Sequence, residues 1–271
     1  MTSIQQLVQR GAVFYCSHSG GKDSQAQYHV IRSQVPDDQI VVVHADLGEV
    51  EWTGVKEHIA ANIDHELNVV KAIWADGSEK TLINQVQRRR VHLDNQGKFD
   101  APAWPSSAAR FCTSDLKRGP IWKFIRNDSK AKGATIVVNA TGFRTEESAA
   151  RAKRIRENGV LYINKRETNT VREAYEWHPI ANLAKAEVFQ VIEDAGQEAF
   201  WTYAEGNERL SCVFCIFGCK GDLANGAKHR PELARKYIAL EKKVRSTLFH
   251  GESLADRLGG EFKGIAIEVV S

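Results

Sequence analysis

The 271-residue sequence contains only five cysteines, and none of its apolar runs is long. A small and odd number of cysteines does not suit the disulfide framework of a secreted scaffold, so the thiols indicate a reducing compartment. No stretch approaches the roughly 18–20 apolar residues that a membrane span needs. The N-terminal segment has no apolar core behind a basic start, so we see no secretory signal. We therefore expect a cytoplasmic protein that has no membrane partner.

The sequence also lacks a strong charge of either sign. Lys and Arg number 37 against 34 Asp and Glu, which gives a formal net charge of +3, so charge alone does not indicate a nucleic-acid partner. Hydrophobic residues make up 42% and charged residues 26% of the chain. These fractions are near the globular average and exclude a disordered or fibrous chain. The length fits one large domain or one domain with an appendage.

Short β-branched runs alternate with helical patterns through the first half of the sequence. The runs that we interpret as strands are Ala12–Cys16, Ile40–His44, Val69–Trp74 and Ala134–Asn139. The helical patterns are Gln25–Ser33, Thr53–Glu66, Glu79–Arg89 and Ser114–Arg126, followed later by Ala184–Ala195 and Glu232–Leu248. This alternation predicts an α/β fold with a mostly parallel sheet. Ligands in such folds bind at the carboxyl ends of the strands.

Two segments depart from this pattern. Val91–Arg110 contains two prolines, a glycine and two serines, and it is typical of a long loop. Loops of this length are usually functional or mobile. Near the C-terminus, Gly264–Val270 is a candidate short strand.

A glycine-rich string, Ser-Gly-Gly-Lys-Asp-Ser, follows the first predicted strand and opens a helical pattern. Glycines let the backbone approach an anion, and amides at a helix N-terminus point toward it. Lys22 adds charge, and Asp23 is a candidate Mg²⁺ ligand, although a first-turn acid also suits the helix dipole. The spacing is not that of a Walker loop. The alternative is a turn without a ligand. The predicted phosphate-binding residues are Ser17, Ser19, Gly20, Gly21, Lys22, Asp23 and Ser24.

Polar residues also follow two later strands. Asp46 comes after the second strand, where an acid suits a ribose hydroxyl or magnesium, although a turn aspartate explains it as well. Gly142, Arg144 and Arg151 come after the fourth strand. Arginine suits forked recognition of phosphate or sulfate. The alternative is a solvated basic face that pairs with the neighbouring glutamates.

Three of the five cysteines are spaced three and four residues apart, at Cys212, Cys215 and Cys219. On a helix they would share one face, and in an extended loop Cys212 and Cys215 would still be a familiar pair of ligands. Three thiolates suit a soft metal or a cluster. A stripe of small core residues is the alternative. Cys112 begins a helical pattern, which favours a thiolate, and is the candidate fourth ligand. Such a set is more typical of [4Fe–4S] than of zinc, which usually joins two close pairs. Cys16 lies in a strand pattern and is expected in the core.

Motifs along residues 13–222 together resemble a known family. Besides the glycine-rich string, the motifs are His44-Ala45-Asp46-Leu47-Gly48, Arg110-Phe111-Cys112-Thr113 with Leu116-Lys117 and Pro120, Gly142 with Arg144, Trp177-His178-Pro179-Ile180, and Ser211-Cys212 with Cys215. The string itself looks like the PP-loop of the adenine nucleotide alpha hydrolase superfamily. The whole set resembles the phosphoadenosine phosphosulfate (PAPS) reductase family and the related sulfurtransferases of DNA phosphorothioation.

The resemblance implies a five-stranded, Rossmann-like (HUP) sheet flanked by helices, with a C-terminal cysteine-bearing helical extension. We divide the chain accordingly into a nucleotide-binding domain, 1–200, and an iron–sulfur-ligating extension, 201–271. The implied cofactors are ATP, or PAPS or its unphosphorylated analogue APS, together with a [4Fe–4S] cluster and Mg²⁺. The implied catalytic residues are Lys22, Asp23 and Asp46. The implied cluster ligands are Cys112, Cys212, Cys215 and Cys219.

Two departures from the family pattern concern cysteines. The reductases carry two adjacent cysteines where this chain has Phe111-Cys112, and Cys219 is the candidate replacement. They also use a nucleophilic cysteine in a C-terminal segment, whereas no cysteine follows Cys219 here. Without that thiol, reduction of a sulfonucleotide has no obvious nucleophile.

Three functions compete on these grounds. The first is an ATP pyrophosphatase-type enzyme that adenylates a substrate for sulfur transfer, as in nucleic-acid thiolation or phosphorothioation. The second is a sulfonucleotide reductase that uses thioredoxin, and the third is a non-catalytic, cluster-bearing nucleotide sensor or complex subunit. The expected partners are an adenine nucleotide, a sulfur donor such as a cysteine desulfurase, a nucleic acid and a second copy of the chain. Candidate contacts to a nucleic-acid backbone are Arg88-Arg89-Arg90 and Lys117-Arg118.

Overall fold

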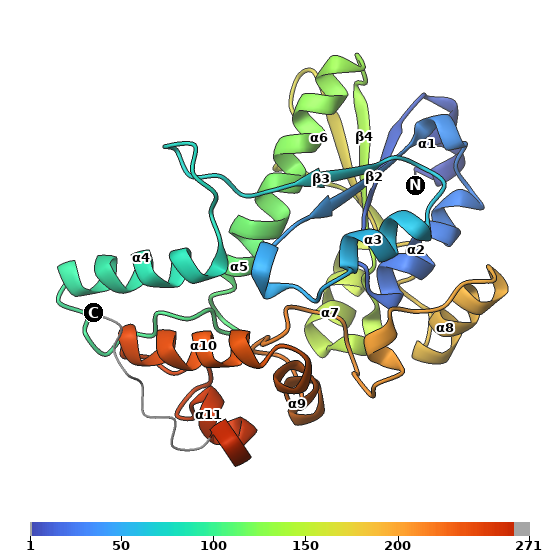
Figure 1. Ribbon diagram of the computed structural model, residues 1–271. Coiled ribbons are helices and arrows are strands. Elements are labelled where there is room, and N and C mark those ends of the chain that lie inside the picture. The colour runs from blue at the N-terminus through green and yellow to red at the C-terminus, as the bar shows by residue number, and fades with distance from the viewer. Residues whose placement is uncertain (1, 263–271) are drawn as a thin grey trace. The chain divides into compact units, whose positions relative to one another are not determined.

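The computed structural model describes residues 2–262 (Figure 1). The chain forms two compact units and passes between them five times, after Asp46, Thr53, Val70, Gly119 and Trp201. The first unit holds the sheet, and the second comprises 47–53, 71–119 and the chain from Thr202 onward. The division into domains 1–200 and 201–271 stays a prediction. The candidate strand Gly264–Val270 lies outside the described residues.

The first unit is built on a six-stranded sheet. Its strands are β1 Val13–Ser17, β2 Ile40–Ala45, β3 Leu67–Val70, β4 Ile136–Thr141, β5 Leu161–Ile163 and β6 Glu173–Trp177. The order across the sheet is β3-β2-β1-β4-β6-β5, and only the β5–β6 pair is antiparallel. The predicted α/β fold with a mostly parallel sheet is therefore confirmed. The predicted count of five strands is wrong, because β5 adds an antiparallel edge.

The sheet contains a reversal of strand order that defines a ligand position. β1 pairs with β2 on one side and with β4 on the other, so the chain order changes direction at β1. In open α/β sheets, ligands bind at the carboxyl ends of the strands that flank such a point. The loop after β1 and the segment after β4 are the two phosphate-binding segments that the sequence predicts.

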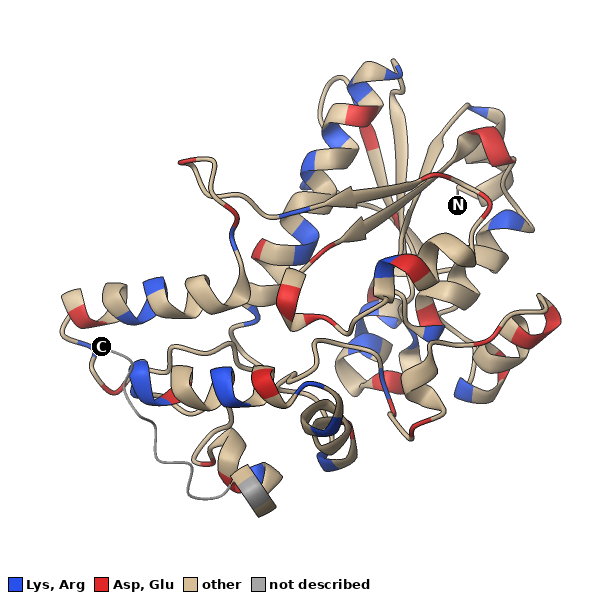
Figure 2. Ribbon diagram, viewed as in Figure 1, with Lys and Arg blue, Asp and Glu red and all other residues tan. Residues whose placement is uncertain are grey.

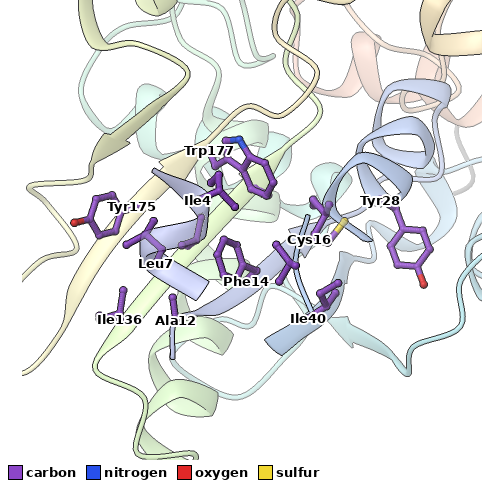
Figure 3. Packing of buried hydrophobic residues seen from close by; sticks show 14 of the residues in the cluster. Ile4, Leu7, Ala12, Phe14, Cys16, Tyr28, Ile40, Ile136, Tyr175 and Trp177 are labelled. Carbon is purple, nitrogen blue, oxygen red and sulfur yellow. The ribbon is translucent and has the colours of Figure 1, made fainter. Parts of the chain in front are cut away.

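Side chains of β1 alternate between the two faces of the sheet. Phe14 and Cys16 join a cluster with Ile4 of α1 (Ile4–Gln9) and Tyr28 of α2 (Lys22–Arg32), as Figure 3 shows. Tyr15 points to the opposite face, where its neighbours include Trp122 and Ile125 of α6 (Gly119–Ala131). Both faces are thus covered by helices, which explains the continuous apolar runs of the strands.

Cys16 is fully buried within this core, as the sequence predicts. Burial raises the pKa of its thiol to about 12, so the side chain stays neutral and behaves as a small apolar residue. The remaining helices of the first unit are α3 Val55–Ala61, α7 Ala149–Asn158 and α8 Lys185–Asp194. Val188 and Ile192 of α8 pack against Ala26 of α2.

The second unit is helical in its described part. Its helices are α4 Leu82–Asn95, α5 Phe111–Thr113, a π-helical turn Ser114–Arg118, α9 Lys220–His229, α10 Pro231–Lys243 and α11 Leu254–Leu258. The predicted loop starting at Val91 is wrong at its beginning, because α4 continues to Asn95. Trp104, in the rest of that loop, stacks on Tyr237 of α10 with ring centres 5.3 Å apart.

Basic and acidic residues are interspersed along α10, whereas α4 carries Arg88, Arg89 and Arg90 together and one acid, Asp94, near its end (Figure 2). Within residues 2–262, no helix is both long and apolar enough to span a membrane.

Candidate functional site

The loop between β1 and α2 is shaped to receive an anion. Gly20 has a φ of +77°, a conformation that residues with a side chain rarely adopt. α2 begins at Lys22 with Gly21 as its N-cap, and no side chain caps it. The first amides of a helix have no partner within the helix. An anion at this position would meet these amides and the positive end of the helix dipole.

The same loop is closed by its own hydrogen bonds. The Ser19 amide donates to Ser24 Oγ at 3.1 Å, and Ser24 Oγ donates to the Gly21 carbonyl at 2.8 Å. The Gly20 amide donates to Nδ1 of His18 at 3.1 Å. Burial and neighbouring histidines lower the pKa of His18 to about 3, so the ring is neutral. Because Nδ1 accepts, the ring proton is on Nε2.

Three charged side chains form a chain of contacts beside the loop. Lys22 Nζ lies 3.2 Å from Asp23 Oδ2, and Arg144 Nε donates to Asp23 Oδ1 at 2.6 Å. Lys22 and Arg144 are each only 4% exposed. Burial lowers the pKa of Lys22, and the Asp23 carboxylate opposes this shift. The structure thus brings three predicted site residues into direct contact.

Gly142 lies where the end of β4 meets the first turn of α2. A Cβ atom at this position would come within 2.8 Å of the Asp23 carbonyl carbon and 2.9 Å of its oxygen. Both are backbone atoms that have no room to move aside. Glycine is therefore required here for close packing of the strand end against the helix, and its predicted contact with a nucleotide remains a prediction.

Arg151 packs against the ring of Phe143, the residue that follows Gly142. Its guanidinium lies 4.9 Å from the centre of the Phe143 ring and forms an ion pair with Glu147. The Phe143 ring stacks on His178 with centres 4.5 Å apart. Thr141 Oγ1 and His178 Nδ1 share a hydrogen bond of 2.8 Å. Burial lowers the pKa of His178 to about 4, so the stacked imidazole is neutral.

Asp46 lies directly after β2 and is buried. Its carboxylate forms a salt bridge with Lys56 of α3 at 3.1 Å. The end of β2 is also joined to the glycine-rich loop, because His44 Nδ1 donates to the His18 carbonyl at 2.9 Å. Ser17, at the end of β1, donates from its hydroxyl to Asn139 of β4 at 2.9 Å. The ends of three adjacent strands are thus linked by polar contacts.

Sequence reasoning missed several residues of this arrangement. His18, Phe143 and Lys56 contact predicted site residues or the backbone of the loop, and His178 stacks on Phe143. His18 stands inside the predicted loop, and His178 follows β6 directly in the Trp-His-Pro-Ile motif. The sequence signal that could have identified His18 and His178 is their position directly after a predicted strand or in a motif beside one.

The cysteines of the second unit lie around a loop and not along a helix. Residues 210–219 contain no helix or strand, so of the two arrangements considered for Cys212, Cys215 and Cys219 the structure shows the loop and not the helical face. Between the first two, Val213 and Phe214 are 2% and 1% exposed and anchor the loop. The Val213 amide donates to the Val50 carbonyl at 2.9 Å.

Cys112, Cys212 and Cys215 interact electrostatically with one another and with Lys117. Burial raises the pKa of Cys212 to about 12, although Lys117 opposes the shift. Burial also raises the pKa of Cys112. For Lys117, burial acts to lower the pKa, but the nearby cysteines and Glu51 together outweigh it and raise the pKa. The three sulfurs therefore share one neighbourhood with Lys117, and Arg110 also acts on Cys112.

Cys219 has a different environment from these three. Its Sγ accepts a hydrogen bond from the Asp222 amide at 3.4 Å, and its own amide donates to Asp222 Oδ2 at 3.2 Å. It is therefore the N-cap of α9. Within residues 2–262, no three His, Cys, Asp or Glu side chains lie close enough together to hold a metal ion. The soft donors of the three-cysteine group suit a thiolate-bound metal or cluster, and Cys219 is held apart as a cap.

No family model matches the chain. An uncharacterised 37.8 kDa protein of Escherichia phage 186, from the gpa 5′ region, is 26% identical over 150 residues. The match covers 55% of this chain and 42% of that relative, so the chain spans less than half of the relative's length.

Two solved structures are similar to this chain. One is a phosphoadenylyl-sulfate (PAPS) reductase from Candida auris in a phosphate complex, with a TM-score of 0.45 and 15% identity over 78% of this chain and 88% of that chain. The other is a 4-thiouridine synthetase in complex with RNA and bound ATP, with a TM-score of 0.39 and 14% identity over 88% of this chain and 54% of that chain.

Proposed function

We propose that this chain is a PP-loop ATP pyrophosphatase-type enzyme, which adenylates a substrate for sulfur transfer. The observation that carries the proposal is the loop Ser17–Ser24, which is closed by its own hydrogen bonds and opens a helix that no side chain caps. Such a helix end binds phosphate through its amides. Lys22 lies at this helix end, where it would meet the pyrophosphate part of ATP.

In the proposed reaction, a nucleophilic oxygen of the substrate forms a bond to the α-phosphorus of ATP. The bond from that phosphorus to the bridging oxygen breaks, and pyrophosphate leaves with the electron pair. Lys22 and the loop amides stabilise the charge that develops on pyrophosphate. The adenylated oxygen is then a leaving group for a sulfur nucleophile, and AMP is released. The sulfur donor is of the cysteine-desulfurase kind, and its persulfide attacks through the terminal sulfur. A thiol then attacks the inner sulfur of the disulfide that results, the S–S bond breaks, and the thiolated product leaves while a new disulfide forms between donor and thiol.

The remaining predicted residues have supporting roles in this proposal. Asp23 fixes Lys22 and Arg144 through its two carboxylate oxygens. Arg144 and Arg151 are expected near phosphate, and Asp46 near the ribose. The carboxylates of Asp23 and Asp46 each face a cationic side chain. This arrangement does not suit Mg²⁺ as it stands, and we derive no step through a metal ion.

The cysteine group is proposed to hold a [4Fe–4S] cluster. Cys112, Cys212 and Cys215 are the supporting ligands, because they share one neighbourhood. Cys219 becomes the fourth only if its sulfur leaves the cap of α9. Such a cluster, when bound, supplies either a sulfur-accepting centre or a structural tie. Lys117 would offset part of the negative charge of the thiolates.

The proposal is tested by replacing Lys22. Lys22→Ala should weaken ATP binding by about 10- to 150-fold, since a hydrogen bond to a charged group contributes about 1.5–3 kcal/mol. The matched control is Lys130→Ala, which removes an exposed lysine of α6 in the same unit. ATP affinity is measured by calorimetry, and pyrophosphate release is measured beside it. Thermal melting of both variants verifies that the fold is retained.

Three outcomes would contradict the proposal. Unchanged ATP affinity in Lys22→Ala would remove the phosphate-binding assignment of the loop. Sulfite release from PAPS or APS with reduced thioredoxin would establish a sulfonucleotide reductase. Tight ATP binding with neither pyrophosphate nor sulfite, in the presence of bulk tRNA and single-stranded DNA, would indicate a non-catalytic nucleotide sensor.

A further inference from the structure

Cations lie on aromatic rings at three places in the second unit, and adjacent residues of the chain, Arg88-Arg89 and Arg110-Phe111, connect these places. Lys80 and Arg88 lie 4.5 and 4.2 Å from the centre of the Trp74 ring. Arg89, the next residue of α4, lies 5.2 Å from the centre of the Phe111 ring. Arg110, which precedes Phe111, lies 4.8 Å from the centre of the Phe217 ring. We call these residues the arginine–aromatic row: Trp74, Lys80, Arg88, Arg89, Arg110, Phe111 and Phe217.

The row is accessible and carries excess positive charge. Phe217 is 38% exposed, and the Arg88 side chain is 53% exposed. Within the described part of the chain, neither Arg89 nor Arg110 forms a salt bridge with an acidic side chain. Arg88 has one such partner, Asp76, at 3.5 Å, and an exposed pair of this kind contributes little. Lys80 has a closer partner, Asp115, at 2.8 Å. The positive charge that the row offers to phosphate therefore comes mainly from Arg88, Arg89 and Arg110.

Arg90 shows by contrast what a structural arginine looks like on the same helix. It is 4% exposed and donates to the carbonyls of Lys98, Phe99 and Ala101. Its guanidinium therefore holds the loop after α4. The sequence groups Arg88, Arg89 and Arg90 as candidate backbone contacts, but only the first two lie on aromatic rings. Arg89 also donates from Nε to the Pro102 carbonyl of that loop at 3.3 Å. Arg88 is therefore the arginine of the three whose described contacts do not include the loop.

We infer that the arginine–aromatic row binds single-stranded nucleic acid. Bases stack on aromatic rings and on the flat faces of arginine, while guanidinium groups meet the phosphates. An acidic peptide would use the charges but not the rings. A duplex would keep its bases stacked inside, away from the rings. RNA and single-stranded DNA share the required chemistry, so both are tested.

The row also ends at the cysteine group. Arg110 stands two residues before Cys112, and Phe217 stands two residues after Cys215. A single-stranded nucleic acid bound to the row would approach the sulfur atoms of Cys112 and Cys215. This part of the inference rests on the proposed function, in which those sulfurs serve sulfur transfer to the bound acceptor. The binding itself needs neither ATP nor a cluster.

The test uses the full chain and fluorescence anisotropy with labelled oligonucleotides of about 12 nucleotides, a length within the usual range for one such site. One sequence is used as RNA, as single-stranded DNA and as duplex. Arg88→Ala/Arg110→Ala should lower the slope of log affinity against log salt by about 1.4, or about 0.7 for each lost phosphate contact. Phe217→Ala should weaken binding about tenfold through lost stacking, and Phe217→Trp should restore it.

The matched control is Arg235→Ala/Lys243→Ala, which removes the same charge from exposed positions of α10. It should leave both affinity and salt slope unchanged. Equal losses in the two double variants, tighter binding of duplex than of single strands, or full competition by polyglutamate would overturn the inference. Because no ATP is present, loss of binding here is separable from failure of pyrophosphate release. ATP affinity of each variant, together with its melting temperature, reports on folding.

Discussion

Two loops of this chain each lead into a helix, and the first turns of these two helices are capped differently. α2 begins after Gly21, and no side chain caps it. α9 begins after Cys219, and both Cys219 and Asp222 close its first turn. The glycine-rich loop of the first unit is held by its own hydrogen bonds. The cysteine loop of the second unit is held mainly by the burial of Val213 and Phe214.

The difference separates two kinds of binding site. An anion site made of backbone amides is complete once the strand, turn and helix have formed. A thiolate site gains its final geometry from the group that it holds, because metal binding and local folding are coupled. Under the proposed function, the first site would be a product of the fold, while the second would depend on its ligand.

The largest expected effect is the loss of iron from Cys212→Ser. If the cysteine group holds the proposed cluster, removal of a ligand should empty it in protein purified without oxygen. ATP affinity should stay the same, because the loop Ser17–Ser24 closes without the cysteines. Iron and sulfide quantitation, with calorimetry of ATP binding, measures both. If this variant retained its iron, the cysteine group would not hold the cluster. If it lost both iron and ATP affinity, the two sites would not form independently of each other.

Acid should weaken the first unit through His178. Burial lowers the pKa of His178 from 6.5 to about 4, so the unfolded chain binds a proton more readily. The corresponding stability is fully present above pH 6.5 and is lost as the pH falls toward 4. It amounts to about 3 kcal/mol at most. Urea unfolding from pH 7 to 4 should show a flatter profile for His178→Gln than for the wild type. The control His250→Gln, at an exposed position, should keep the wild-type profile.

Gly142→Ala tests whether the first site is built by close packing. The added Cβ would lie 2.8 Å from the Asp23 carbonyl carbon, and overpacking of this kind costs about 1–3 kcal/mol. The free energy of unfolding should fall by that amount, and ATP affinity should fall with it as Asp23 shifts. The control is Gly133→Ala, where no atom lies within 4 Å and only the positive φ adds strain. A drop no greater than in this control would contradict the close-packing explanation.

The smallest expected effect is that of Cys219→Ser. Serine is a better N-cap than most residues, so α9 should keep its start and the melting temperature should hardly change. Iron content should stay near that of the wild type, because the other three cysteines remain. Complete loss of iron in this variant would show that Cys219 leaves the cap and serves as the fourth ligand.

Where the fold is governed by local pattern, the sequence predicts it well. β1, β2 and β4 are apolar runs buried on both faces, and each lies within two residues of its predicted position. The third strand is displaced to Leu67–Val70, because those residues pair with β2 while Ile73 forms only an isolated bridge. β5 has three residues and no pattern of its own. β5 forms because it can pair with the edge of β6. Such a tertiary contact cannot be recognised from the local sequence.

In the candidate site, too, some residues could be predicted from local sequence and others could not. Lys22, Asp23 and Arg144 were predicted from spacing and strand ends, and they do meet. His178 was not predicted, because Thr141, its hydrogen-bond partner, lies 37 residues away in the sequence. For Cys219, spacing indicates a ligand, yet the sulfur has a competing use as a helix cap. Spacing alone cannot distinguish between two uses of the same atom.

The five passages of the chain between the two units have a consequence for how this protein can evolve. Neither unit is a continuous stretch, so no single crossover between two genes could replace one unit and keep the other whole. A graft of the C-terminal residues alone would leave Leu47–Thr53 and Lys71–Gly119 behind, and with them Cys112. The glycine-rich loop and Cys112 are therefore exchanged together with segments of both units, whichever single crossover is made.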